Sequence, residues 1–197
     1  MTVNHVVPGS NPGCGVSHYK YLKTFLIMKK LCYIDSFFPE ELYQKYVNSS
    51  LNCQYEDTNQ SKRSFTTKDL RDIDLNLCET FIDYIKKTFN LEIIDCELRF
   101  YKRKNTIYNP HVDGYPLHIL VYLQGEKCNF ENGTFFMNKK NDKISVQISN
   151  FENTAVIFDG NFIHGSVQGK YNESETGFRY SLNCFIKDYK YVEKEQC

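Results

Sequence analysis

Three residues of the types that bind divalent metals stand at a promising spacing: His111 and Asp113, separated by a single residue, and His164 further along the chain. Side chains two positions apart on a β-strand point to the same face, because they alternate with a period of two. A histidine from a second strand could then complete three ligands on one side of a metal, leaving other positions open for small ligands. We predict His111, Asp113 and His164 to be metal ligands, with donor atoms roughly 3–4 Å apart, since metal–ligand bonds measure about 2 Å.

A second polar group follows the distal histidine. The strand-like run 178–187 places Arg179, Ser181 and Asn183 on one face. An arginine that points inward from a strand is costly unless an anion pairs with it. A carboxylate would pair with the guanidinium fork of Arg179, and Ser181 would add a hydrogen bond. The run therefore predicts a carboxylate-binding position beside the metal, unless its polar face is simply exposed to solvent.

The remaining histidines fit the metal set less well. His118 follows Asp113 by five positions within an otherwise apolar run, so we expect it to lie in the core or to hydrogen-bond a ligand. His5 and His18 belong to an N-terminal segment of different character.

Composition excludes several classes of protein. The chain has 24 Lys and Arg residues against 24 Asp and Glu, so no overall basic field attracts nucleic acid or an anionic membrane. No apolar stretch approaches the roughly 18 residues that span a bilayer. The eight cysteines include no C-x-x-C pair, which argues against a zinc site and against a disulfide scaffold. We expect mostly reduced thiols and a cytoplasmic protein.

The first 27 residues differ from the rest, because their turn-forming residues lack any periodic apolar flank. We expect residues 1–27 to be either a disordered tail or an extension produced by a start codon assigned too early, with translation beginning at Met28. Residues 28–197 are then a single domain.

Helical signals dominate the first third of that domain, after a short strand at 31–34. A helix is expected to begin near Pro39, a polar loop to cover 48–62, and a helix to run over 67–89 with Asn90 at its end. After residue 91 the pattern changes to short strands separated by turn residues, which favours a sandwich or barrel. The expected strands are 93–102, 117–123, 133–138, 143–148, 155–158, 164–168 and 178–187.

The order His-x-Asp, distal His and Arg-x-Ser within late strands resembles the Fe(II)/2-oxoglutarate-dependent dioxygenases, and the prolyl 4-hydroxylase-like branch in particular. Three further stretches are similar to that branch: 99–101 (Arg-Phe-Tyr), 121–123 (Val-Tyr-Leu) and 132–136 (Asn-Gly-Thr-Phe-Phe). The resemblance covers roughly 98–186. It departs at Asn132, where the branch has a second glycine, and at Arg179, where prolyl hydroxylases commonly have lysine.

The resemblance implies an α+β protein, with a double-stranded β-helix (jelly roll) core over about 91–188 and N-terminal helices packed on its sheet. It implies Fe(II) held by His111, Asp113 and His164, and 2-oxoglutarate held by Arg179 and Ser181, with Tyr101 adding a hydrogen bond. Oxygen would be the co-substrate and ascorbate a stimulating reductant. A prolyl or other peptide side chain, or a small molecule, would be hydroxylated with release of succinate and CO₂.

Two alternatives have distinct sequence requirements. A nucleic-acid or nucleotide dealkylase of the same superfamily would use basic patches beside aromatic residues, such as 61–65 and 101–104, but the dealkylases' second arginine shortly after the first is missing. A non-catalytic jelly-roll binding module would have lost at least one of the ligand and anchor residues, and all of them are present.

Overall fold

The computed structural model describes residues 31–58, 64–104, 108–125, 133–138, 140, 143–166 and 178–192. The expectations for residues 1–27 and for a start at Met28 lie outside these ranges. Within the described ranges the helices are α1 (Glu40–Asn52), α2 (Leu70–Ile73) and α3 (Leu75–Phe89). The strands are β1 (Leu31–Ile34), β2 (Glu56–Asp57), β3 (Ser64–Thr66), β4 (Leu91–Lys104), β5 (Tyr108–His111), β6 (Leu117–Gly125), β7 (Thr134–Met137), β8 (Ile144–Ile148), β9 (Thr154–Phe158), β10 (His164–Ser166) and β11 (Phe178–Tyr191).

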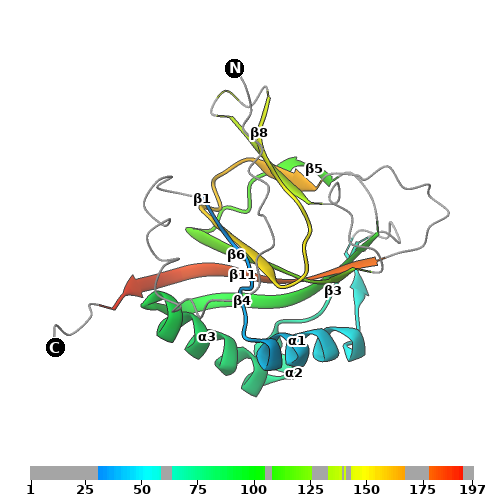
Figure 1. The fold of residues 1–197 in the computed structure, drawn as a ribbon, viewed down its shortest axis with the longest axis vertical. Coiled ribbons are helices and arrows are strands. Elements are labelled where there is room, and N and C mark those ends of the chain that lie inside the picture. The colour runs from blue at the N-terminus through cyan, green and yellow to red at the C-terminus, as the bar shows by residue number, and fades with distance from the viewer. Residues whose placement is uncertain are drawn as a thin grey trace, which may run out of the picture.

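The strands form two antiparallel sheets. The larger sheet has the order β1-β9-β6-β11-β4-β3-β2, and the smaller has the order β5-β10-β7-β8. The helices cover one face of the larger sheet, and the smaller sheet lies over its other face (Figure 1). The N-terminal helices therefore pack on the sheet as the sequence predicts, and the larger sheet has an outer face toward the helices and an inner face toward the smaller sheet.

Strand alternation gives the two faces of the larger sheet different characters. The outer face contributes buried apolar side chains to a core shared with the helices: Leu98, Phe100, Ile119, Val121, Ala155, Ile157, Leu182, Cys184 and Ile186. A smaller apolar cluster between the sheets includes Leu120, Tyr122, Phe136, Ile148, Val156 and Phe158. The inner face of β11 also carries polar side chains, among them Arg179 and Ser181 of the predicted carboxylate site.

The long helical pattern of 67–89 is divided in two. Asp74 has φ −155° and ψ 80°, which ends α2, and its side chain accepts a hydrogen bond from Leu77 N at 2.9 Å as the N-cap of α3. Apolar spacing does not reveal such a break, because the apolar face continues across it. Asn90 ends α3 in the left-handed region at φ 52°, as expected.

Two other expectations need correction. The polar loop expected over 48–62 is partly regular, because α1 continues to Asn52 and the short strand β2 follows. The helical turns hold despite their polarity because Ser50 is buried and bonds Val47 O. The strand expected to carry both His111 and Asp113 ends at His111: it is β5, and Pro110 lies within it at the edge of the smaller sheet, where a missing N–H costs no ladder bond.

The described cysteines are all free thiols, and three of them, Cys78, Cys96 and Cys184, are buried. This agrees with the expectation of reduced core thiols for that part of the chain. Over the same ranges, the structure contains no helix with the length and apolarity needed to cross a membrane.

Candidate metal centre

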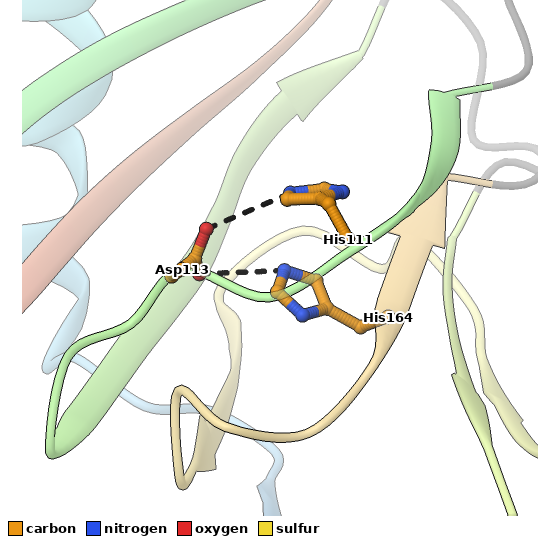
Figure 2. A group of neighbouring side chains, drawn as sticks. All are labelled: His111, Asp113 and His164. Atoms are coloured by element: carbon orange, nitrogen blue, oxygen red, sulfur yellow. Dashed lines mark ion pairs between the residues drawn. The ribbon is translucent and has the colours of Figure 1, made fainter. Parts of the chain in front are cut away.

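His111, Asp113 and His164 converge on one point. His111 Nε2 lies 3.6 Å from Asp113 Oδ1, and His164 Nε2 lies 3.3 Å from Asp113 Oδ2. One donor atom from each residue can be chosen so that all three lie within 4.8 Å of one another. Figure 2 shows both histidine rings turned toward the carboxylate from one side. The two contacts with Asp113 lie within the predicted 3–4 Å, and the set as a whole fits within 4.8 Å.

The two histidines are brought together by strand pairing in the smaller sheet. His111 at the end of β5 is the register partner of His164 at the start of β10, and their ring centroids are 4.5 Å apart. Four strands, β6 to β9, separate them along the described part of the chain. Adjacent antiparallel strands place register partners on the same face, which is why two distant histidines meet.

Asp113 is oriented by a contact between two loops and not by the strand alternation that the sequence predicted. It lies beyond the end of β5, so strand alternation does not orient it. The backbone N–H of Asp113 instead donates to Gly160 O at 3.0 Å, which ties the loop after β5 to the loop before β10. Strand β6, which follows this loop, belongs to the larger sheet. The chain therefore crosses between the sheets directly after the metal ligands.

Two glycines permit this crossing. Gly114 has φ +75°, a conformation that side-chain-bearing residues rarely adopt. A Cβ on Gly160 would lie 2.3 Å from Tyr115 O, so only glycine allows the two loops to approach this closely. The position of Asp113 therefore depends on a contact between two loops.

Both histidines present the same nitrogen to the site. Nδ1 of His111 lies 2.9 Å from Asn109 O, and Nδ1 of His164 lies 2.9 Å from Phe162 O. A carbonyl oxygen can only accept, so each Nδ1 donates to it, and each Nε2 is the ring nitrogen that faces Asp113 and would bind a metal. This arrangement suits a divalent cation better than it suits a purely structural ion pair.

The charge states also suit a cation. Burial raises the pKa of Asp113, but hydrogen bonds with His111 and His118 outweigh it, so its pKa falls well below the usual range. Burial lowers the pKa of His164 to about 4, so this ring is neutral at neutral pH. The Asp113 hydrogen bond raises the pKa of His111 against the effect of its burial. The set therefore offers one carboxylate and at least one neutral imidazole, a donor set that fits Fe(II).

The predicted carboxylate-binding residues lie together on the inner face of the larger sheet. Tyr101 on β4 is the register partner of Ser181 on β11, with Arg179 two positions before it. Arg179 is partly buried; its guanidinium donates to Ser166 Oγ at 2.5 Å and to Gly133 O at 3.3 Å. Burial lowers its pKa to about 10, which leaves it a cation at neutral pH. The reading of this face as solvent-exposed is therefore wrong for Arg179 and for Ser181, which is buried.

Several residues around Arg179 were not singled out by the sequence. Ser166 on β10 bonds both Arg179 and Arg103 Nη1, the latter at 3.4 Å. Tyr122 on β6 donates to Thr134 Oγ1 at 2.7 Å, and the nearby Arg179 charge opposes the rise that burial causes in the pKa of Tyr122. Tyr122 lies four positions after His118 on one strand, a spacing that could have indicated the shared inner face.

The basic patch 101–104 is not a uniform solvated surface. Arg103 packs its guanidinium 4.9 Å from the centre of the Tyr101 ring on the inner face. Lys102 lies on the other face, 4.3 Å from the centre of the Phe178 ring. The patch 61–65 is described only from Ser64 onward, and Ser64 is buried. The described part of these patches therefore offers no continuous basic groove of the kind a nucleic-acid enzyme would use.

His118 is a buried neighbour of the metal ligands. Its Nδ1 lies 2.6 Å from Asp113 Oδ2, and its Nε2 lies 3.2 Å from Asn183 Oδ1. The sequence left open whether it is a core residue or a partner of a ligand, and the structure gives it both features.

Comparisons with known proteins show which solved structures share this fold. No family model matches the chain, and no curated protein matches it by sequence. Among solved structures, a prolyl hydroxylase from Trichoplax adhaerens, in complex with a hypoxia inducible factor peptide, has a TM-score of 0.64 at 13% identity, covering 85% of this chain and 88% of that one. A prolyl-4-hydroxylase from Pseudomonas putida has a TM-score of 0.61 at 14% identity, covering 85% and 96%. HygX from Streptomyces hygroscopicus, with nickel and 2-oxoglutarate bound, has a TM-score of 0.62 at 9% identity, covering 92% of each chain. At such identities the likeness establishes a shared fold.

Proposed function

We propose that this protein is an Fe(II)- and 2-oxoglutarate-dependent dioxygenase with a jelly-roll core, of the prolyl 4-hydroxylase-like branch. The observation that carries the proposal is the convergence of two Nε2 atoms and one carboxylate, with one donor atom of each residue within 4.8 Å of the others. An inward-facing arginine and serine on the opposite sheet complement it. A metal site and a dicarboxylate-binding site would thus lie together between the two sheets, as in other proteins of this fold.

Each residue has a separate role in this proposal. His111, Asp113 and His164 hold Fe(II) through Nε2, one carboxylate oxygen and Nε2. Arg179 binds the distal carboxylate of 2-oxoglutarate, and Ser181 and Tyr101 donate hydrogen bonds to it. The buried setting of Arg179 supports this role, since desolvation strengthens its attraction for an anion. Ascorbate would keep the iron reduced.

The reaction consumes one O₂ and one 2-oxoglutarate for each substrate C–H bond. Bound Fe(II) supplies the redox chemistry that activates O₂ while 2-oxoglutarate is oxidised to succinate and CO₂. One oxygen atom enters succinate and the other replaces the substrate C–H bond with C–OH, so atoms and electrons balance. The chain's own residues orient the co-substrate and exclude water, and the apolar rings of Phe136 and Phe158 beside His164 serve the second purpose.

A peptide side chain, prolyl or other, is the favoured substrate, with a small molecule as the next choice. The Trichoplax adhaerens enzyme, which shares the fold, is in complex with a peptide. We further propose that the enzyme acts in the cytoplasm, in keeping with its free thiols.

The test is succinate release from 2-oxoglutarate with Fe(II) and ascorbate, together with calorimetric binding of 2-oxoglutarate in the presence of Mn(II). Wild type should bind 2-oxoglutarate and release succinate slowly even without substrate. His111→Ala should lose both properties, and Arg179→Ala should lose affinity for 2-oxoglutarate while still binding Mn(II). Lys190→Ala, at a side chain that is 63% exposed, is the matched control and should behave as wild type. Absence of both turnover and 2-oxoglutarate binding in wild type would reject the proposal.

A further inference from the structure

Contacts on both ring faces and at both nitrogens hold the imidazole of His118 in place. It is 3% exposed, and its ring lies between two phenylalanine rings, with centroids 4.6 Å from Phe158 and 4.4 Å from Phe185. Both of its nitrogens face polar side chains, Asp113 on one side and Asn183 on the other. The imidazole therefore cannot rotate without losing two polar contacts and two aromatic contacts.

Asn183 connects His118 to Ser181, one of the residues proposed to bind 2-oxoglutarate. It is 4% exposed, and its Nδ2 donates to Ser181 Oγ at 2.9 Å. Four side chains thus form an unbroken polar path between the sheets, in the order Asp113, His118, Asn183 and Ser181. One end of the path is a proposed metal ligand, and the other is a proposed ligand of 2-oxoglutarate.

The path constrains the functional group at each end. Asp113 has two oxygens, and the 2.6 Å contact with His118 engages Oδ2, which fixes the plane of the carboxylate and leaves Oδ1 on the side of His111. At the other end, Ser181 Oγ already accepts from Asn183, so its own hydroxyl proton is available to an anion. A buried network in which each member has a partner can hold such orientations, whereas an isolated side chain would rotate.

We propose that His118 and Asn183 are positioning residues of the metal and co-substrate site. His118 fixes the Asp113 carboxylate for metal binding, and Asn183 orients Ser181 toward the distal carboxylate of 2-oxoglutarate. This inference rests on the proposed function. Partners of metal ligands commonly change metal affinity by about 10–100-fold when they are removed, which sets the size of the effect to expect.

Two conservative variants separate positioning from simple packing. In His118→Asn, the side-chain nitrogen occupies the place of Nδ1 and can keep the bond to Asp113. In His118→Gln, it occupies the place of Nε2, so the bond to Asn183 is kept and that to Asp113 is lost. Both variants leave a neutral amide of smaller size, so a purely structural role predicts similar metal affinities for the two.

The measurement is Mn(II) affinity by electron paramagnetic resonance titration of the metal-free protein, with circular dichroism to confirm the fold. We expect His118→Gln to bind Mn(II) about tenfold or more weakly than wild type, and His118→Asn to recover most of that loss. The control is Thr154→Val on β9, the strand next to β6; it removes a buried hydroxyl and its bond to Phe151 O. It should leave the Mn(II) affinity unchanged. Equal affinities of wild type and both His118 variants would overturn the role of His118.

Asn183→Leu tests the second half of the proposal through 2-oxoglutarate affinity at saturating Mn(II). We expect several-fold weaker binding of 2-oxoglutarate with a smaller change in Mn(II) affinity; unchanged 2-oxoglutarate affinity would overturn the role of Asn183. The underlying function fails separately: wild type that binds neither Mn(II) nor 2-oxoglutarate rejects the enzyme and the positioning roles together. Wild type that binds both, with variants that bind equally well, rejects only the positioning roles.

Discussion

The two faces of β11 perform different tasks with one backbone. Leu182, Cys184 and Ile186 point outward into the core beneath the helices, where all three are buried among apolar neighbours. The alternate residues, Arg179, Ser181 and Asn183, point inward and bond other polar side chains or backbone oxygens. The outer face is stabilised by non-directional apolar burial, whereas the inner face depends on specific partners at specific distances. Stability and chemistry are therefore separable in this protein, and substitutions on the two faces should have different consequences.

The largest expected effect is on the inner face, at the metal ligands. His164→Ala should weaken Mn(II) binding by more than about a hundredfold, because a ligand contributes more than the partner groups whose loss costs 10–100-fold. Succinate release should be abolished, while the free energy of unfolding of the metal-free protein changes little. Titration calorimetry and urea unfolding measure the two quantities. A variant that retains Mn(II) affinity would show that His164 is not a ligand.

The opposite pattern is expected on the outer face. Phe100 is fully buried beneath the helices, so Phe100→Ala should lower the free energy of unfolding by about 3–5 kcal/mol. The folded fraction should bind Mn(II) with wild-type affinity. Loss of metal affinity in the folded variant would contradict the separation of the two faces.

Two substitutions of Arg179 separate the effect of its charge from that of its planar shape on 2-oxoglutarate binding. Arg179→Met should weaken 2-oxoglutarate binding by roughly ten- to a hundredfold, since hydrogen bonds to charged groups are worth about 1.5–3 kcal/mol. Arg179→Lys should fall between this variant and wild type, because it keeps the charge but loses the planar fork. Binding at saturating Mn(II) provides the measurement. Equal 2-oxoglutarate affinities of Arg179→Met and wild type would show that Arg179 does not bind the distal carboxylate.

The smallest effect expected is a dependence of metal-free stability on pH. The pKa of His164 is about 4 in the folded protein, against a usual value of 6.5, because of burial. The unfolded chain therefore binds a proton more readily, so this stability is fully present above pH 6.5 and is lost as the pH falls toward 4. The loss between pH 7 and pH 5 should be about 2 kcal/mol. It should be absent in His164→Gln; the same pH dependence in both proteins would contradict the burial of a neutral ring.

Individual strands and helices show which parts of the fold could be predicted from the sequence. The strands after residue 91 were placed to within a few residues, since their alternation and turn residues are local signals, and the inward face of Arg179, Ser181 and Asn183 followed from the same period. The break at Asp74 was missed because the apolar face is continuous across it. The strand that carries His111 was expected from the spacing of His111 and Asp113, but its end before Asp113 was not, because the pairing of β5 with β10 that decides it is not a local signal.

The sequence by itself determined the types and order of the chemical groups: two histidines, an aspartate, and an arginine with a serine two positions later. Only the tertiary structure decided how they meet. His111 and His164 are opposed by pairing between strands distant in sequence, and Asp113 is held by a loop contact at Gly160 rather than by strand alternation. Local periodicity carries no information about which distant segments pair or how closely two loops can approach. The links from His118 to Asp113 and Asn183 are likewise visible only in the folded chain, because one joins β6 to the loop after β5 and the other joins the neighbouring strands β6 and β11.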